Sequence, residues 1–284
     1  MRILLKLVIA LLVLVGLVAV ALYQIYFKTG QYVHEGPLAS PPSQTLQDAS
    51  WVDLFDGETL TGWIPKLVGS TLGEDVRDTF RVQDGAITVA YDNYPQWNGE
   101  FGHLFYHLPF THYVLQLEYR FLGEQIAEGA AMAWAWRNSG VMIHSQAPDS
   151  MAMDQDFPVS LEVQLLGAHP DEYRPTANLC TPGTHVELHG KRHTQHCMLS
   201  TSPSFVGDDW ITLEVEVRGN ELTRHFINGE LVFEYSKPHL DTWMGPGKKL
   251  AENGTARTVT GGYIALQSES HPVQFRNIRL MGLN

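Results

Sequence analysis

Two polar segments of the chain carry side chains suited to acid–base chemistry. Glu162 and Gln164 lie two residues apart in the alternating stretch VSLEVQLLG, so both project from the same face of a predicted strand. Arg137 and Asn138 precede a second apolar stretch, in which Gly140 lets the backbone turn closely. A carboxylate can take a proton, and an arginine with amide groups can hold hydroxyls and polarise a carbonyl oxygen. The alternative is that the first segment meets water and the second only caps a turn.

The segment HVELHGKRHTQHC, residues 185–197, is the richest in titratable groups. Histidine changes its protonation near neutral pH, so His193 and His196 are candidates for a base or a substrate-binding group. Imidazole also binds transition metals. The spacing matches no strong metal motif, however, and Gly190 interrupts any helical pairing of the histidines. We therefore expect neither a resident metal nor another cofactor.

Three further positions are candidates for substrate binding. Glu118 projects from the polar face of another alternating strand, and would form a carboxylate pair with Glu162 if the two strands were neighbours. Gln267 lies near the C-terminus in a polar cluster that includes Glu269. His144 alternates with apolar neighbours, and a lone histidine of this kind is more often structural than functional.

The N-terminus predicts contact with a membrane. Basic residues precede an uncharged apolar run, Leu7 to Phe27, which is long enough to span a bilayer as a helix. The A-x-A triplet at residues 19–21 offers the alternative of a cleaved signal peptide. We favour an anchor over residues 1–28, because the apolar character continues past that triplet. A Pro- and Ser-rich linker over residues 29–50 would then hold the exported domain, periplasmic or extracellular, off the membrane.

The chain has two cysteines, Cys180 and Cys197, and both fall in the exported part. In an oxidising compartment a disulfide between them is the default expectation, and such a loop closure stabilises the fold by ~3 kcal/mol in the chain-entropy model. Two free buried thiols are the alternative. A disulfide would also hold His196 in place, because that residue adjoins Cys197.

Composition limits the class of partner. The 284 residues are 44% hydrophobic and carry a formal net charge of −12. Such a chain can bury a sizeable core, and its acidity argues against nucleic acid, because phosphate contacts need clustered Lys and Arg. The charge fits a neutral or cationic partner, or solubility alone.

The dominant pattern after residue 50 is alternation with a period of two. It is clearest over residues 113–121, 159–165 and 211–217, which predicts half-buried antiparallel strands. Asn228-Gly229 between two such runs is a strong hairpin signal. Beyond the N-terminal segment no window predicts a long amphipathic helix. We expect one all-β domain over residues 51–284, a two-sheet antiparallel sandwich or jelly roll.

Several stretches together resemble one family. WVDLFDGETLTGW, NSGVMIH, VSLEVQLLG, DDWITLEVEV, HFINGELV and GGYIALQSESHPVQFRNIRL follow the order and spacing of the 3-keto-disaccharide hydrolase domain family. The resemblance covers almost everything after residue 50. It implies a concanavalin-like jelly roll and cleavage, by hydrolysis or elimination, of glycosides whose sugar carries a ketone at carbon 3. Two insertions, IPKLVGSTLGEDVRD and GEQIAEGAAMAWAW, bear on the substrate more than on the fold.

That chemistry gives the candidates their roles. A ketone at carbon 3 acidifies the hydrogen on carbon 2; a base removes it, the glycosidic oxygen leaves carbon 1, and water adds back. We expect Glu162, His193 or His196 to act as base. Arg137, Asn138 and the remaining polar candidates would bind the sugar. The alternatives are a non-catalytic carbohydrate-binding module, and an endo-glycosidase, whose paired carboxylates only LEVEV at residues 213–217 approximates.

Overall fold

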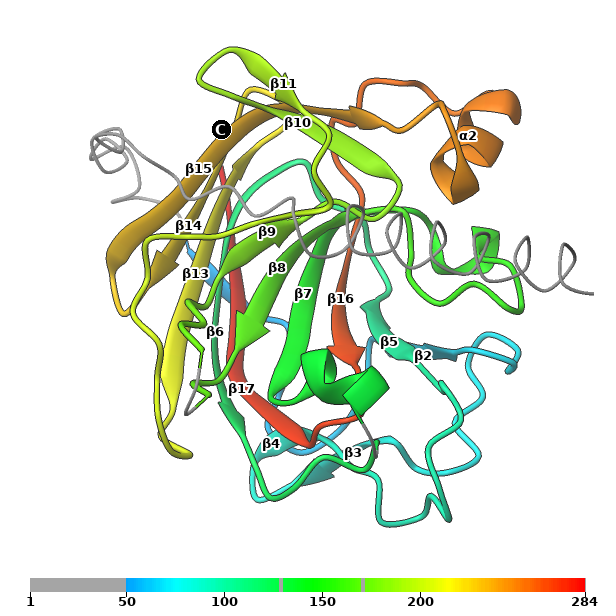
Figure 1. The fold of residues 1–284 in the computed structure, drawn as a ribbon, viewed down its shortest axis with the longest axis vertical. Helices are drawn as coiled ribbons and strands as arrows, with labels where there is room; N and C mark the ends of the chain where they lie inside the picture. The colour runs from blue at the N-terminus through cyan, green and yellow to red at the C-terminus, as the bar shows by residue number, and fades with distance from the viewer. Residues whose placement is uncertain (1–49, 128–129, 170–171, 284) are drawn as a thin grey trace, which may run out of the picture.

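The protein is described here from a computed structural model, which covers residues 50–127, 130–169 and 172–283. Two antiparallel sheets pack face to face, as expected from the alternating sequence (Figure 1). The membrane segment predicted for residues 1–28, and the linker up to residue 49, lie outside the described residues. Within the described ranges no helix is both long and apolar enough to cross a bilayer.

The two sheets differ in the number of their strands. One is seven-stranded, in the order β12 (Cys197–Met198), β9 (Asn178–Cys180), β8 (Leu161–Leu166), β7 (Asn138–Ser145), β16 (Tyr263–Ser268), β5 (Gly102–Tyr106) and β2 (Trp63–Leu67). The other is ten-stranded, in the order β11 (Lys191–His193), β10 (Thr184–Leu188), β15 (Glu230–Leu240), β14 (Leu222–Ile227), β13 (Ile211–Arg218), β6 (His112–Phe121), β17 (Val273–Gly282), β4 (Ala86–Val89) and β3 (Phe80–Gln83), with β1 (Trp51–Asp53) pairing with β17.

The core lies between the sheets. Val163 of β8 and Leu266 of β16 point inward from the seven-stranded sheet, and Leu117 of β6 and Val215 of β13 point inward from the other. All four are fully buried, and each such side chain contributes about 1.5–3 kcal/mol by leaving water. Because side chains alternate along a strand, the residues between these core positions project from the outer face of each sheet.

A hairpin turn forms at Asn228-Gly229, as the sequence predicts, and a second one forms at Asp84-Gly85. Asn228 and Gly229 join β14 to β15 with φ of 50° and 83°, and Asp84 and Gly85 join β3 to β4 with φ of 51° and 74°. Positive φ at both central residues matches the twist of the flanking strands, which is why Asn, Asp and Gly are preferred there.

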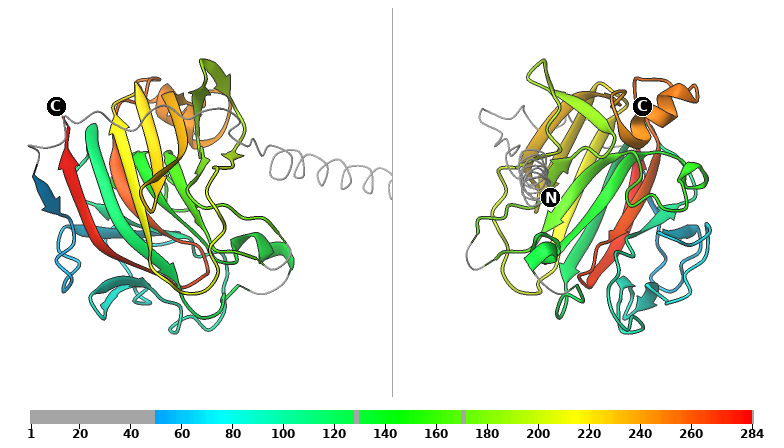
Figure 2. Two further views of the ribbon diagram at one scale, coloured as in Figure 1. Left: turned by 90° about the vertical axis from the view of Figure 1, so that its left-hand side faces the viewer. Right: turned by 45° about the vertical axis from the view of Figure 1, so that its right-hand side comes forward.

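Short helices and loops cover the outer face of the seven-stranded sheet. The 3₁₀ helix η2 (Ala130–Ala135) lies in front of this face, and η3 (Pro148–Ser150) belongs to the loop between β7 and β8 (Figure 1). The α-helix α2 (Gly245–Glu252) lies at the other end of the sandwich, near the β10–β11 hairpin (Figure 2).

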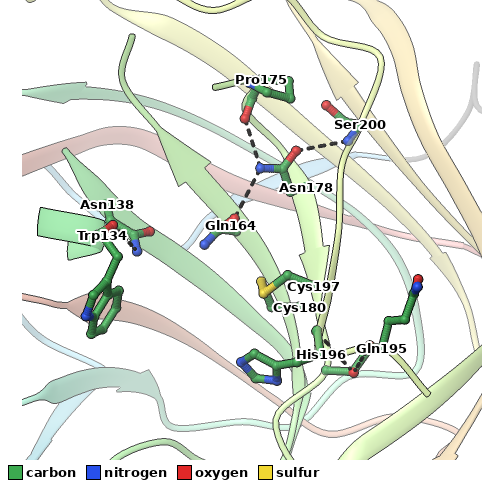
Figure 3. The surroundings of a disulfide bond; sticks show 11 residues. Trp134, Asn138, Gln164, Pro175, Asn178, Cys180, Gln195, His196, Cys197 and Ser200 are labelled. Carbon is green, nitrogen blue, oxygen red and sulfur yellow. Dashed lines mark hydrogen bonds between the residues drawn. A yellow bond between two sulfur atoms is a disulfide. The ribbon is translucent and has the colours of Figure 1, made fainter. Parts of the chain in front are cut away.

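The cysteines form the expected disulfide. Cys180 of β9 and Cys197 of β12 are joined by an S–S bond of 2.06 Å and face each other across the strand pair. The alternative of two free thiols is therefore wrong. The bridge attaches the short edge strand β12 to the seven-stranded sheet (Figure 3).

Candidate active site

A row of polar residues crosses the outer face of the seven-stranded sheet. Strand register places Gln267 of β16 opposite His103 of β5, and Gly140 of β7 opposite Gln164 of β8. Lys66 of β2 and Asn178 of β9 continue the alignment at its two ends. We call this set the polar row: Lys66, His103, Gln267, Gly140, Gln164 and Asn178. It brings residues from six strands, five of them with polar side chains, onto one face.

Glu162 lies against the polar row because Gly140 has no side chain. Glu162 is 6% exposed. A β-carbon on Gly140 would lie 2.7 Å from its Oε1 atom and 2.8 Å from its Cγ atom. The carboxylate thus occupies the space above Gly140, with the Gln267 amide beside it. Any larger residue at position 140 would displace it.

Burial makes Glu162 hard to ionise. Loss of solvent raises its pKa to about 8, and the neighbouring amide of Gln267 opposes this only in part. Glu269, just beyond the end of β16, is also buried, and its pKa is raised well above the usual range. Burial is the main cause for Glu269 and the charge of Glu162 adds to it, while the Arg174 guanidinium acts in the opposite direction. Two carboxylates that repel each other in a dry environment hold protons at neutral pH.

Several buried polar atoms beside this pair have no protein partner among the described residues. They include both imidazole nitrogens of His103, both amide atoms of Gln267, Oε2 of Glu269 and Oδ1 of Asn138. Burial, with a smaller effect from the charge of Lys66, lowers the pKa of His103 to about 3, so its imidazole is neutral. An unpartnered buried polar group costs about 1–3 kcal/mol, and such a concentration is typical of a binding site rather than of a core.

Aromatic side chains line the site beside His103. Phe101 packs against Trp97, Phe157 and Trp134 at centroid distances of 5.5, 5.0 and 6.3 Å, and Phe157 meets the His103 ring at 6.0 Å. Trp134 comes from η2 and is 44% exposed. We call Trp97, Phe101, Trp134 and Phe157 the aromatic wall. Flat apolar surface next to polar donors and acceptors suits a sugar ring, which has both kinds of surface.

Four of the predicted residues come together here. Glu162 and Gln267 adjoin, and Asn138 and Gln164 lie on the same outer face, on β7 and β8. Gln164 is partly exposed and accepts a hydrogen bond from Asn178 at 3.1 Å (Figure 3). Asn138 donates to the carbonyl of Trp134 at 3.5 Å, which leaves its Oδ1 atom unpartnered. Their amide groups can accept and donate hydrogen bonds to hydroxyls.

Arg137 lies at the start of this region but is already engaged. Its guanidinium donates to Asp208 Oδ1 at 2.9 Å and to the carbonyl of Gly207 at 2.5 Å, and it stacks on Trp136 at 5.3 Å. The side chain is therefore anchored to the loop before β13, at the edge of the site. The cation whose charge acts on Glu269 is instead Arg174, which donates to the carbonyl of Trp136 at 2.6 Å.

Two predicted residues lie elsewhere. The condition stated for Glu118, that its strand neighbours that of Glu162, is not met: β6 belongs to the ten-stranded sheet, and Glu118 bonds to Arg276 at 2.6 Å on that sheet's outer face. His144 is buried at a bulge of β7, where its Nε2 atom contacts the carbonyl of Gly219 at 2.8 Å. Burial lowers the pKa of His144 to about 4, so it fits the structural alternative.

The two histidine candidates for the base, His193 and His196, lie at different sheets. His193 lies on β11, the edge strand of the ten-stranded sheet, so its strand belongs to the sheet opposite Glu162. His196 precedes Cys197, and its ring lies beside the disulfide (Figure 3). Cys180 is the cross-strand neighbour of Glu162, so His196 belongs to the same end of the seven-stranded sheet. Burial lowers the pKa of both histidines.

Sequence reasoning missed three residues of the site, Lys66, His103 and Arg174. His103 sits in the alternating run GHLFY, and nothing in that run marks it as different from any polar residue on a strand. Glu269 was noticed as part of a polar cluster but given no role. Only strand pairing places these residues beside Glu162, so no local signal could have identified them.

Two further expectations concern metals and endo-glycosidases. In the part of the chain that the structure describes, no group of three or more His, Cys, Asp or Glu side chains is arranged to hold a metal ion. Glu214 and Glu216, from the acidic run LEVEV, lie on β13 of the ten-stranded sheet. Glu216 is bound by Arg218 and Arg224, and Glu214 by Gln116, as expected of a structural face.

The contact between Gly140 and Glu162 predicts the outcome of adding one methyl group. Gly140→Ala should lower the free energy of unfolding by about 1–3 kcal/mol, the usual cost of overpacking, because the Glu162 side chain must move. Gly282→Ala is the matched control, since a β-carbon there meets nothing within 4 Å. In an E162A background the cost of Gly140→Ala should shrink, as measured by denaturant unfolding. An equal cost in both backgrounds would contradict this.

The raised pKa values predict how stability depends on pH. From the unfolded pKa near 4.5 up to about 8, folded Glu162 holds a proton that the unfolded chain has lost. The free energy of unfolding should therefore fall as pH rises, by about 1.4 kcal/mol per pH unit for each such carboxylate. Between pH 6.5 and 8 the buried histidines are neutral in the folded chain but partly protonated in the unfolded chain, so they add a slope of opposite sign. The effect of Glu162 is therefore isolated by comparing the wild-type chain with E162Q.

Across that window, the change of the free energy of unfolding with pH should be more negative for the wild-type chain than for E162Q, by about 1.4 kcal/mol per pH unit below pH 8, because the histidines contribute equally to both. Equal slopes would mean that Glu162 is ionised in the folded protein at neutral pH.

The individual known proteins named here resemble this chain only distantly. A search of curated protein sequences gave no match. Among solved structures, a candidate glycosyl hydrolase from Parabacteroides distasonis is 18% identical, with a TM-score of 0.46 over 82% of this chain and 94% of that one. The carbohydrate-binding module CBM66 from Bacillus subtilis is 10% identical, with a TM-score of 0.40 over 78% and 96% of the two chains.

The family of this protein is assigned from its sequence. The sequence profile of the 3-keto-alpha-glucoside-1,2-lyase-like domain matches residues 50–281, which is most of the chain and nearly all of the described sandwich. The resemblance noted from the sequence is thus confirmed: this chain belongs to the 3-keto-alpha-glucoside-1,2-lyase-like, or 3-keto-disaccharide hydrolase, domain family.

Proposed function

We propose that this chain cleaves 3-keto-glycosides by proton abstraction at carbon 2, elimination of the glycosidic oxygen from carbon 1, and hydration of the product. One observation carries the proposal: Glu162 and Glu269 form a buried, mutually repelling carboxylate pair surrounded by polar atoms that no protein group satisfies. Membership of a family named for a glucoside lyase supports the same chemistry.

The carboxylate pair supplies one base and one acid. Both pKa values are raised, and the charge of either carboxylate makes ionisation of the other harder. The ionised form of lowest energy therefore carries a single negative charge. We assign that charge to Glu162, whose pKa of about 8 lets it ionise near neutral pH, and the retained proton to Glu269. A base with a pKa near the working pH is well suited to removing a weakly acidic C–H proton.

The proposed steps balance as follows. Glu162 takes the proton from carbon 2, and the electron pair moves into the ketone to give an enolate. The enolate then expels the glycosidic oxygen from carbon 1, and Glu269 protonates that oxygen, leaving a conjugated enone. Water then adds at carbon 1 and gives one of its protons to the Glu269 carboxylate, while the proton on Glu162 returns to carbon 2. Both carboxyl groups regain their starting protonation, and the free 3-keto sugar and the alcohol are released.

The unpartnered polar atoms are suited to stabilising the enolate and holding the sugar. The Gln267 amide, beside Glu162, has a free N–H to donate, and neutral His103 can donate one more. Donors fixed in a buried site stabilise developing charge without having to reorganise. The Asn138 and Gln164 amides would bind hydroxyls, and the aromatic wall would pack on the apolar face of the ring.

The role of base has a second candidate. His196 stays a prediction, because it lies at the same end of the sheet beside the disulfide and its lowered pKa leaves it neutral and able to accept a proton. Glu162 is preferred because the unpartnered donors gather around it. His193 is on the other sheet, which argues against a direct part in this site.

Replacing the carboxylates separates these roles. E162Q should lower turnover of a 3-keto-glucoside by about 10²–10⁴-fold, the usual contribution of a positioned base. E269Q should slow cleavage most with poor leaving groups, because an amide cannot protonate the departing oxygen. E214Q is the matched control, a half-buried glutamate with a raised pKa on the other sheet, and should keep full activity.

Release of free sugar from a 3-keto-disaccharide, followed against pH, provides the measurement. The rate should rise as Glu162 ionises towards about pH 8. Full activity of E162Q would contradict the assignment of Glu162 as the base. Binding of the 3-keto-disaccharide without any release by the wild-type chain would favour the second candidate function, a carbohydrate-binding module, which the exposed Trp134 of the aromatic wall would also serve.

The proposal also covers the location of the enzyme in the cell. Residues 1–28 would anchor the chain in the cell membrane with the domain outside the cytoplasm, where the Cys180–Cys197 disulfide can form. After cell fractionation we expect the full-length chain in the membrane fraction, resistant to salt washing and accessible to added protease. Recovery of a shortened chain in the soluble fraction would indicate a cleaved signal peptide instead.

A further inference from the structure

A second pocket lies at the opposite end of the sandwich from η2. It has a volume of about 310 Å³ and is formed by β10, β15 and the segment around α2. It shares no residue with the polar row or the aromatic wall, and the hairpin and helix beside it lie far from η2 in all three ribbon views (Figures 1 and 2). We call it the cationic pocket and define it by six of its lining residues: His185, Arg192, Lys237, His239, Trp243 and Arg257.

Basic groups gather in this pocket although the chain as a whole is acidic. Arg192 and Arg257 are exposed, and within the described ranges neither guanidinium takes part in an ion pair or hydrogen bond. Lys237 is paired with Glu187 at 2.8 Å, which keeps its positive charge beside the pocket but shares it. Two arginines with free N–H groups can bind a carboxylate through paired hydrogen bonds.

The two histidines offer ring nitrogens to a ligand. His185 Nε2 lies 3.6 Å from Asp241 Oδ1, and His239 Nδ1 lies 3.0 Å from the carbonyl of Lys237. The other ring nitrogens, Nδ1 of His185 and Nε2 of His239, are buried without a protein partner. Burial, opposed by Asp241, lowers the pKa of His185, and the nearby charge of Arg192 adds to this effect, so the His185 ring adds no positive charge at neutral pH.

Trp243 gives the pocket an apolar surface. Its side chain is 83% exposed, and among the described residues it makes no contact with another ring. Its position is set by the backbone, where the N–H of Trp243 donates to Asp241 Oδ1 at 2.8 Å. A tryptophan left in water beside a charged pocket is unusual, because the indole is normally packed, and its flat face is available to a ligand.

We propose that the cationic pocket binds an acidic sugar residue, with its ring on Trp243 and its carboxylate held by Arg192 and Arg257. A free anion would use the arginines but leave Trp243 exposed, and a neutral sugar would use Trp243 but leave the arginines unpaired. A uronic acid uses both, and its hydroxyls can bond to the free nitrogens of His185 and His239. This site is independent of the proposed function, and would hold the chain on an acidic glycan.

Calorimetric titration of the full chain in detergent tests the proposal with glucuronate, glucose, acetate and inorganic phosphate. Glucuronate should bind at least tenfold more tightly than each of the other three. Trp243→Ala and Arg257→Gln should each weaken glucuronate binding at least tenfold. Arg279→Gln is the matched control, since that arginine is held by Gln116 on the outer face of the ten-stranded sheet, and should leave binding unchanged.

The remaining outcomes decide between sites and ligands. E162Q should bind glucuronate like the wild-type chain, so the result does not depend on whether the enzyme is active. Loss of binding in E162Q would place the sugar at the candidate active site and overturn the proposal. Equal affinity for phosphate or acetate, no effect of Trp243→Ala, or no binding of glucuronate at all would overturn it as well.

Discussion

The packing of Glu162 over Gly140 determines the arrangement of the candidate active site. On the outer face of a sheet, a carboxylate usually extends into water. Here the neighbouring strand carries a glycine at position 140, so the Glu162 carboxylate packs against the sheet, over Gly140 and beside Gln267. A side chain at position 140 would displace the Glu162 carboxylate from this position, in which burial raises its pKa.

The buried polar groups of the candidate active site lower the free energy of unfolding of the domain. Glu162 and Glu269 hold protons against their usual tendency, and His103 and Gln267 lack hydrogen-bond partners among the described residues. A core that interlocks the two sheets can offset costs of this size, because each buried aliphatic side chain contributes about 1.5–3 kcal/mol. The Cys180–Cys197 disulfide also stabilises the fold close to the site, because it holds the edge strand β12 against β9.

The sandwich separates two kinds of polar surface. The seven-stranded sheet gathers polar groups that lack partners, whereas on the outer face of the ten-stranded sheet Glu118 and Glu216 are bound by arginines. The distinction between a functional and a structural polar face is therefore whether the groups satisfy one another. By the same criterion, the cationic pocket, with unpaired arginines and an exposed tryptophan, resembles the first face rather than the second.

Period-two alternation and the Asn228-Gly229 turn were enough to predict an antiparallel sandwich, because these signals arise from local geometry. The same alternation put Glu162 and Gln164 on one face of a strand, and family resemblance supported their importance. It could not distinguish Glu162 from Glu118, which has the same local pattern but belongs to the other sheet. Only the tertiary structure decided that His103 and Glu269 join Glu162 and that the Arg137 guanidinium is held by Asp208, because strand order and register depend on contacts between residues far apart in the sequence.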